Sequence, residues 1–293
     1  MRKYLYFFIV PVIFAQTVSD YSYTGAQASA MAGAIVAENG NGLSIFHNPA
    51  GITEIDGMSF SAGGGHLYGF SWLPAYHLSG IISWPLLGHI GIGLQQFETK
   101  FNGSILSSEQ TLSLAQGFEL QHDKNSHLSI GYVANFVQWD LGRSAGISGD
   151  GSDGLTLGSL NSVTIDVGVL ASLRKRYRFG VFLKNLNSGG LGKGMTRQVL
   201  PRRINVGVTY LPAPGLSTSI VSEHLLGRDD LQIKGAIRYD LNSFFTLHVG
   251  AQSNPNRFGV GARLTLGRQS ISYGLLTHPV LPMTQQFNLS MSL

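Results

Sequence analysis

The sequence predicts an all-β fold: a transmembrane antiparallel outer-membrane β-barrel of about 14 strands, with roughly 12 to 16 allowed, around a short N-terminal plug that contains a small helix. Three observations predict it. Beyond Gly57, many short stretches alternate between apolar and polar residues, as strands with two different faces do. Charged residues make up only 12% of the chain, and 38 of its 293 residues are glycine. The N-terminus carries an apolar leader typical of exported proteins.

Residues 1–15 are expected to be a signal peptide. The stretch begins Met1-Arg2-Lys3 and continues as an apolar run to Ala15, too short and too early for a membrane-spanning helix. Its removal takes two of the 20 Lys and Arg residues and leaves 18 against 16 Asp and Glu, so the mature chain is nearly neutral and does not indicate a nucleic-acid partner. Cysteine is absent, which excludes disulfides and thiol chemistry. A large exported chain without disulfides points to a bacterial cell envelope, where large sheets can supply the stability.

Residues 16–56 are expected to form the plug, or hatch. Residues 25–38 are rich in alanine, which favours a short helix of small cross-section, and the following Asn39-Gly40 provides a stop. Further on, the Asn-Pro-Ala-Gly motif disfavours helix before the proline and permits a tight reversal at the glycine, as expected of a turn into the first strand. The residues assigned to the plug are Gly25, Ala32, Gly33, Ala34, Asn48, Pro49, Ala50 and Gly51.

Residues 57–293 are expected to form the barrel. In residues 161–174, one face carries valine, isoleucine and leucine, and the other serine, threonine, aspartate and glycine. This pattern fits a soluble sandwich with apolar faces inside or a membrane barrel with apolar faces outside. The barrel is favoured because the polar faces are rich in glycine and serine rather than lysine and glutamate. Aromatic residues near strand ends fit membrane-surface girdles, although aromatics are common in any strand: Trp72, Trp84, Trp139, Tyr177, Tyr210, Tyr239, Phe245 and Tyr273.

The strand number follows from the length of this region. With roughly 10 residues for a spanning strand and roughly 5 to 7 for its connection, residues 57–293 allow about 14 strands. Residues 141–160 and 186–202 are expected to be the longest loops, on the outer side. Residues 69–94 contain no Asp, Glu, Lys or Arg and are long enough for a membrane helix, but their prolines and glycines favour hairpins.

The chain ends in an alternating stretch that predicts a barrel-closing strand. Asn288, Ser290 and Ser292 form one face, and the other consists of Phe287, Leu289, Met291 and Leu293. Outer-membrane barrels end in this way because the last strand pairs with the first and turns its apolar face to lipid.

Several charged residues are expected to line the lumen, because the alternation places most of them on the polar sides of successive strands. They are the basic residues Lys234, Arg238, Arg257 and Arg263 and the acidic residues Asp166, Glu223 and Asp240. They fit either a structural network that fills the lumen and holds the plug, or a ligand contact.

No catalytic, cofactor or metal site is predicted, so the chain is not expected to be an enzyme. His122 and His127 bracket a polar turn and lack the spacing of a zinc-binding helix. Asp150 and Asp153 resemble part of a calcium loop without its later acidic ligand. Around Lys193, a glycine stands where a phosphate loop needs Ser or Thr to bind magnesium.

Two groups of residues resemble FadL-type outer-membrane barrels and, within that superfamily, the PorV/PorQ family. The first is Thr24-Gly25-Ala26 through Ala32-Gly33-Ala34, followed by Asn48-Pro49-Ala50-Gly51, and the second is formed by residues 273–280 and 286–290. The resemblance covers both ends of the chain, and the middle matches only in its strand pattern.

The resemblance implies a function without cofactors: passage of hydrophobic small molecules across the outer membrane, past an N-terminal hatch in the lumen. The partners it implies are outer-membrane lipid and a hydrophobic small-molecule ligand. The alternative it implies is a structural or shuttle component of type IX protein secretion, with secretion-machinery proteins or cargo as partners.

Overall fold

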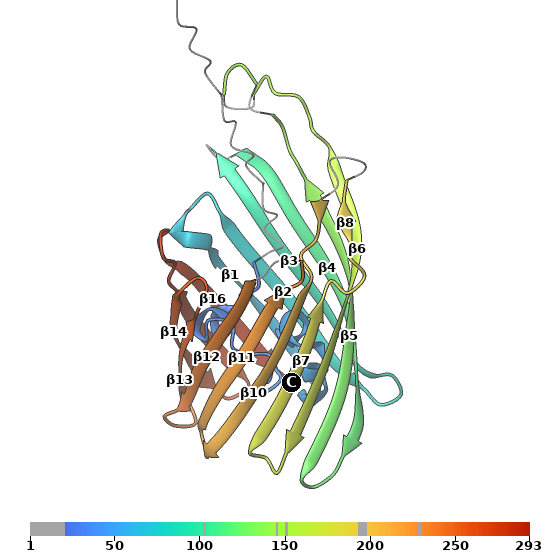
Figure 1. Cartoon of the computed structure of the whole chain (residues 1–293), viewed down its shortest axis with the longest axis vertical. Helices are drawn as coiled ribbons and strands as arrows, with labels where there is room; N and C mark the ends of the chain where they lie inside the picture. The colour runs from blue at the N-terminus through green and yellow to red at the C-terminus, as the bar shows by residue number, and fades with distance from the viewer. Residues whose placement is uncertain (1–20, 102–103, 145, 150–151, 193–197, 228–229) are drawn as a thin grey trace, which may run out of the picture.

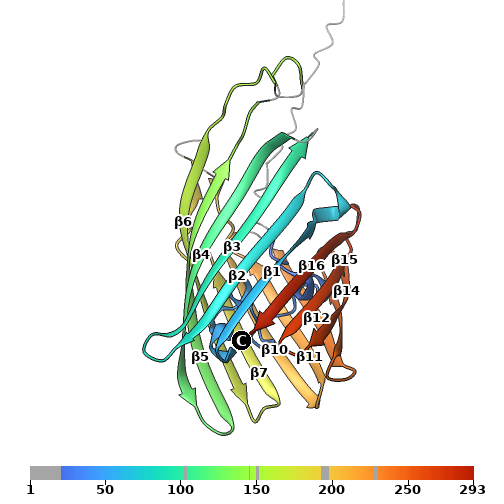
Figure 2. The same cartoon turned by 180° about the vertical axis from the view of Figure 1, so that it is seen from behind.

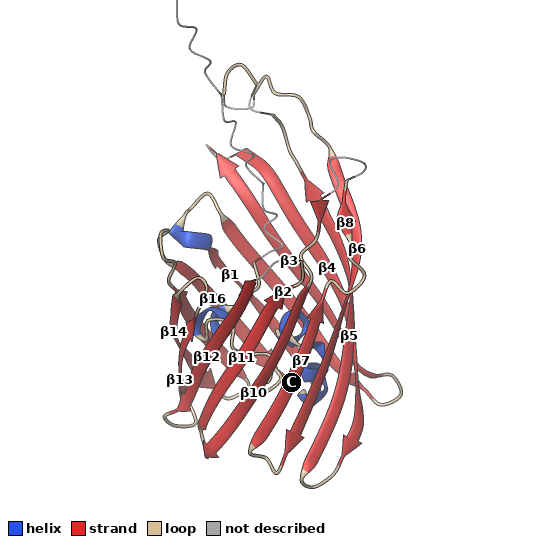
Figure 3. Ribbon diagram, viewed as in Figure 1, coloured by secondary structure: helices blue, strands red, loops and turns tan. Residues whose placement is uncertain are grey.

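Fourteen strands of the described residues form one closed antiparallel barrel, which confirms the predicted fold (Figures 1 and 3). The computed structural model describes residues 21–101, 104–144, 146–149, 152–192, 198–227 and 230–293. The expected signal peptide (residues 1–15) and the first part of the expected plug (16–20) lie outside the described residues. Each strand pairs with the next along the chain, β7 pairs with β10, and β1 closes the barrel against β16.

The barrel strands are β1 (Met58–His66), β2 (Pro74–Trp84), β3 (Gly88–Phe101), β4 (Ser104–His122), β5 (Ser126–Asp140), β6 (Ser159–Leu173), β7 (Tyr177–Lys184), β10 (Arg203–Ala213), β11 (Leu216–Leu225), β12 (Asp230–Asp240), β13 (Phe245–Gln252), β14 (Arg257–Leu266), β15 (Gln269–Leu276) and β16 (Thr284–Ser292). A separate short hairpin pairs β8 (Gly190–Leu191) with β9 (Gln198–Val199). The helices are α1 (Ala26–Ala30), α2 (Ser44–His47) and the 3-10 helices η2 (Pro49–Glu54) and η3 (Leu67–Gly69). Within the described ranges, no helix has the length and apolar character needed to cross a membrane.

The apolar faces of the strands point outward and the polar faces point into the barrel. In β6, Val163 is 50% exposed, whereas its neighbour Thr164 is fully buried. The same alternation runs through β12, where Ile233 is exposed and Lys234 is buried. The soluble sandwich is therefore excluded, because its apolar faces would lie inside. Residues 69–94, the candidate membrane helix of the sequence, instead contribute to the β2–β3 hairpin.

The barrel wall is uneven in height. Strands β3 to β6 contain 14 to 19 residues and extend past the other strands, which contain 8 to 11 (Figures 1 and 2). We call the end with these extensions the loop end, because the connections 141–158 and 186–202 lie there. The opposite end, with short connections such as 123–125 and 214–215, is the turn end.

One loop folds inward over the loop end. Leu191 and Leu200 of the 186–202 connection are buried against Val137 and the partly buried Trp139. Trp139 therefore faces inward and donates a hydrogen bond from Nε1 to Ser107 at 2.9 Å. Its expected place in an outer aromatic girdle is wrong, whereas the other seven aromatic residues of that group are exposed.

Residues 21–56, which we call the inner segment, lie inside the barrel with α1, α2 and η2 (Figure 3). The helix expected over residues 25–38 is shorter, because α1 ends at Ala30 and both Ala32 and Gly33 take positive φ angles, 46° and 79°. The chain then continues without helix to α2, which lets it follow the curved wall.

The last strand, β16, pairs with β15 on one side and β1 on the other. Phe287 and Leu289 are exposed on its outer face, Met291 is partly buried, and the Leu293 amide donates to the Met58 carbonyl at 2.8 Å. The first and last strands thus complete the ring of hydrogen bonds, and the described barrel has no free edge.

Candidate functional site

The inner segment fits the lumen because glycines of the wall leave room for its backbone. A Cβ atom on Gly259 would overlap with the carbonyl oxygens of Ser29 and Ala30, and one on Gly274 would overlap with that of Ala26. A Cβ atom on Gly250 would overlap with the Met31 backbone. We call these three residues of β13, β14 and β15, together with Gly261, the glycine patch.

A second group of wall glycines contacts the remainder of the inner segment. Gly131 and Gly168 approach Pro49, Gly117 approaches Ile52, and Gly180 and Gly207 approach Val36. At each of these points an inward glycine lets the inner segment and the wall come into direct contact.

The predicted plug motif joins the inner segment to the wall. The Asn48 side chain caps η2 by accepting a hydrogen bond from the Ala50 amide at 3.2 Å. Its Nδ2 donates to the Val36 carbonyl at 2.8 Å and to the Val169 carbonyl of β6 at 3.1 Å. Pro49 follows at the first position of η2, where its missing N–H leaves no hydrogen bond unmade.

Two carboxylates of the inner segment form ion pairs with arginines of the wall. Glu38 is buried and pairs with Arg238 of β12 at 3.2 Å. Glu54 accepts hydrogen bonds from Arg178 of β7, at 2.7 Å to each oxygen. Sequence reasoning missed Glu38, Glu54 and Arg178. A signal was present, because Glu38 and Glu54 are the only acidic residues between Tyr21 and Ile55 and therefore need partners on the wall.

The residues expected to line the lumen meet in separate groups. Glu223 pairs with Lys234 at 2.8 Å and with Arg203, which sequence reasoning missed, and all three side chains are buried. Asp166 accepts hydrogen bonds from Asn135 Nδ2 at 2.8 Å and from the Asn185 amide at 2.7 Å.

The other lumen residues contact the inner segment or the strand ends. Arg257 lies over the Tyr23 ring, 5.4 Å from its centroid, and Arg263 donates to Gln27 and, at 3.3 Å, to Ser272. Asp240 lies at the turn end, accepts from Thr246 at 2.7 Å and lies 4.0 Å from Arg238. Most of these charges thus hold the inner segment or tie strands together.

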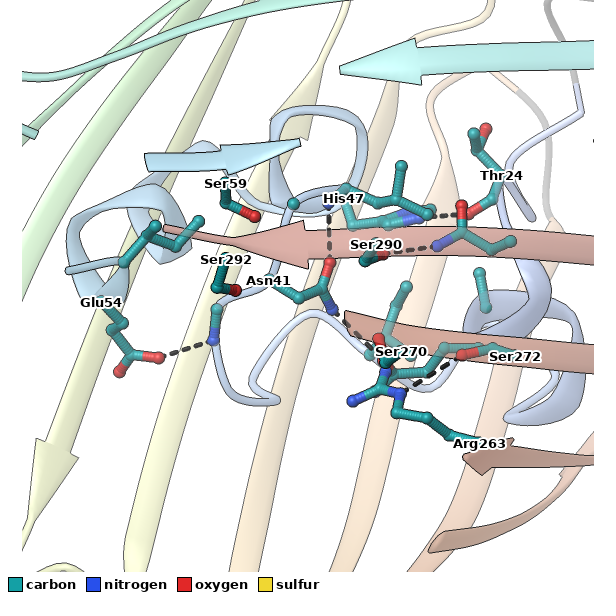
Figure 4. Close-up of a pocket in the computed structure, with 18 of the residues that line it drawn as sticks. Thr24, Asn41, His47, Glu54, Ser59, Arg263, Ser270, Ser272, Ser290 and Ser292 are labelled. Carbon is teal, nitrogen blue, oxygen red and sulfur yellow. Dashed lines mark hydrogen bonds between the residues drawn. The ribbon is translucent and has the colours of Figure 1, made fainter. Parts of the chain in front are cut away.

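A polar cavity of about 390 Å³ lies between the inner segment and strands β1, β14, β15 and β16 (Figure 4). Serine hydroxyls from the wall, Asn41 and His47 of the inner segment and the Arg263 guanidinium line it. The His47 ring donates from Nε2 to the Thr24 carbonyl at 2.7 Å. Because Ser59, Ser270 and Ser292 lie near strand ends at the turn end, the cavity lies on that side of the inner segment.

An apolar aromatic cluster lies on the other side, towards the loop end. Its centre consists of Tyr21, Tyr23 and Phe97. The ring centroid of Tyr21 lies 5.3 Å from that of Tyr23 and 6.2 Å from that of Phe97. Leu67, Leu276 and the partly buried Tyr68 and Leu73 pack around them. A small cavity of about 30 Å³ lies beside Tyr21, Phe97 and Phe46. The inner segment separates this cavity from the polar one, and a hydrogen bond from Gln95 to Thr24 lies at the division.

Burial lowers the pKa of His47 to about 4, from an ordinary value of 6.5, so the ring is neutral near pH 7. An unfolded chain takes up a proton at this ring near pH 6.5, and the folded chain does so only near pH 4. Between these values the unfolded state binds more protons, so the free energy of unfolding is expected to fall as the pH drops from 6.5 to 4. The contribution of His47 is fully present above pH 6.5.

His47→Gln is expected to remove this step, because an amide can donate to the Thr24 carbonyl but does not titrate. Urea unfolding in lipid vesicles at pH 7 and pH 4.5 gives the free energy of unfolding at each pH. The change between the two values is expected to be smaller in His47→Gln than in the wild type. His66→Gln, at an exposed site, is the control. Equal pH dependence of wild type and His47→Gln would contradict the assignment.

Comparison with solved structures shows the same fold. The chain matches the CymD monoaromatic hydrocarbon channel with a TM-score of 0.63 and 10% identity, covering 92% of this chain and 97% of that one. It matches the toluene transporter TbuX of Ralstonia pickettii with a TM-score of 0.58 and 12% identity, over 92% and 97% of the two chains. A FadL homologue of Pseudomonas aeruginosa matches with a TM-score of 0.53 and 11% identity, over 91% and 97%.

At these identities the likeness concerns the fold alone. No protein-family model matches the sequence, and no curated protein does. The neighbours agree with the FadL part of the resemblance, and nothing supports the narrower PorV/PorQ assignment.

Proposed function

We propose that the chain is an outer-membrane barrel for the passage of hydrophobic small molecules, with the inner segment as its hatch. The observation that carries the proposal is the apolar aromatic cluster on the loop side of the inner segment, in a barrel with the fold of hydrocarbon channels. The proposal includes no catalytic step. No contact of the described residues and none of these neighbours favours a role in type IX secretion, so we do not propose that function.

The outer face of the barrel supports a position in the membrane. On β5 the outward residues are apolar or aromatic from Leu128 to Phe136, nine residues that suit a bilayer-spanning strand of about 9 to 11. The next outward residue, Gln138, is paired with Gln110 on β4 and Asn161 on β6, and all three amides are exposed. In this proposal the row of amides is the edge of the lipid-facing surface nearest the loop end. The strands extend beyond it towards the loop end.

The proposed path begins at the loop end. A hydrophobic molecule enters there and meets Tyr21, Tyr23 and Phe97, which offer apolar ring faces. The inner segment blocks further passage, because it separates the aromatic cluster from the polar cavity and is bound to the wall by the Glu38 and Glu54 ion pairs. A shift of the inner segment then opens the way.

Uptake by cells tests the function. Gram-negative host cells that express the chain are expected to accumulate a hydrophobic naphthylamine dye several-fold faster than cells with an empty vector. The barrel must be shown to be folded in the outer membrane by its heat-dependent migration on a denaturing gel. A folded barrel with no gain in uptake would overturn the proposal.

A reversible lock tests whether the second half of the inner segment must move. The hydroxyls of Thr53 in η2 and Ser129 in β5 lie 2.9 Å apart, and the chain contains no cysteine. In the double variant Thr53→Cys and Ser129→Cys, oxidation is expected to form a disulfide and to lower the uptake, and reduction is expected to restore it. Each single variant is the control. Unchanged uptake with a disulfide verified by mass spectrometry would show that η2 stays in place during passage.

A further inference from the structure

Three side chains with metal-ligating atoms meet at the turn end of the barrel, where β4 connects to β5. They are Glu119, His122 and His127, and one ligand atom from each lies within 4.8 Å of the others. Among the described residues, this is the one group of three or more such side chains with this spacing. It lies outside the inner segment and the cavities described above.

A β-bulge brings the three together. Glu119 is opposite Ser129, but Gln121 is opposite Leu128 and His122 is opposite His127, so Leu120 is the extra residue. Without the bulge, strict alternation would place His122 on the opposite face of β4 from Glu119. The extra residue reverses the alternation, so that both side chains point to the face on which His127 lies. The spacing of the two histidines in the sequence gave no sign of this.

The geometry suits a transition metal. His122 Nδ1 and Glu119 Oε2 are 3.1 Å apart, and the two histidine rings meet edge to face with centroids 4.0 Å apart. Two ligands at about 2.0 to 2.2 Å from a tetrahedral zinc ion are separated by about 3.3 to 3.6 Å. The Glu–His pair, at 3.1 Å, lies close to this separation. Because His122 is exposed, its ring is free to turn to a shared ion.

We propose that Glu119, His122 and His127 form a binding site for one divalent first-row transition metal ion, such as Zn²⁺. Two imidazoles and one carboxylate are ligands that suit zinc, and three protein ligands leave a position for water or for a further ligand. An ion in this place would connect β4 to β5 across their turn. The ordinary alternative is a hydrogen bond between Glu119 and His122, which makes no use of His127.

Isothermal titration of the detergent-solubilised full chain, purified without a histidine tag, tests the site. One Zn²⁺ is expected to bind per chain, with no binding of Mg²⁺, which prefers oxygen ligands. Loss of a residue that only hydrogen-bonds to a metal ligand typically weakens metal affinity roughly 10-fold to 100-fold. His122→Ala and His127→Ala each remove a ligand itself, so each is expected to weaken the affinity for Zn²⁺ by at least that factor. His66→Ala, an exposed histidine at the loop end, is the control.

The two histidine variants separate the outcomes. His66 and His122 are exposed, and His127 is partly exposed at the start of β5, next to the β4–β5 turn. The barrel is therefore expected to stay folded, which heat-dependent migration on a denaturing gel checks. Absence of saturable Zn²⁺ binding by the wild type would overturn the proposal. So would wild-type affinity in His127→Ala, because that result leaves only the hydrogen bond between Glu119 and His122.

Discussion

Gly259→Val is expected to displace α1 from the lumen while the barrel stays closed. The added side chain would overlap with the carbonyl oxygens of Ser29 and Ala30, and backbone atoms cannot turn away as a flexible side chain can. The wall at Gly259 is held by hydrogen bonds to β13 and β15, so the weaker contact with the inner segment is the one expected to yield. Overpacking of this kind typically costs about 1 to 3 kcal/mol.

A single thiol reports the displacement. Because the chain contains no cysteine, Ala28→Cys in α1 gives one reactive group, and Ala28 is 1% exposed. Labelling by a membrane-impermeant maleimide is expected to be slow in Ala28→Cys alone. If Gly259→Val weakens the binding of α1 to the barrel wall by 1.4 kcal/mol or more, labelling of the double variant is expected to be at least about tenfold faster. Gly235→Val is the matched control, because a Cβ atom there meets nothing closer than 3.9 Å. Equal labelling in all three proteins would show that α1 does not depend on the glycine patch.

The sequence sufficed for the barrel wall because the two faces of each strand meet different surroundings. Val163 and Thr164 are neighbours in the chain, yet one is exposed on the outer surface and the other is fully buried. Alternation of apolar and polar residues along one stretch of sequence predicts the two faces of a strand, even when the strands that pair with it are not known. The lengths of the alternating stretches then limited the number of strands, and the small residues of the N-terminal region indicated a confined segment.

The pairings inside the lumen could not be predicted in the same way. Glu38 and Arg238 are 200 residues apart, and they meet only because α1 ends early and the chain turns along the wall. Trp139 lies on the inward face of β5, and it is partly buried because a loop some 50 residues further on folds over it. His122 shares a face with Glu119 because of one extra residue in β4. Each of these depends on the path of a distant segment or on a local break in the alternation. Neither can be predicted from amino-acid composition or from the two-residue alternation of the strands.

Glu223→Gln is expected to give the largest loss of stability, about 3 to 5 kcal/mol, because it leaves buried positive charge without its carboxylate. Lys234 is 1% exposed and contacts Glu223 at 2.8 Å, and Arg203 pairs with the other oxygen. Lys234 also lies over the Tyr23 ring, 5.3 Å from its centroid, so the loss is expected to loosen the start of the inner segment as well.

Urea unfolding in lipid vesicles, followed by tryptophan fluorescence, measures the effect. Lys234→Met alone is expected to cost less, because Glu223 keeps its pair with Arg203. The double variant Glu223→Gln with Lys234→Met is expected to be more stable than Glu223→Gln, since it also removes the uncompensated charge. If the two substitutions instead add, the charges do not interact in the folded barrel. If they compensate, the cluster is a structural tie between β10, β11 and β12.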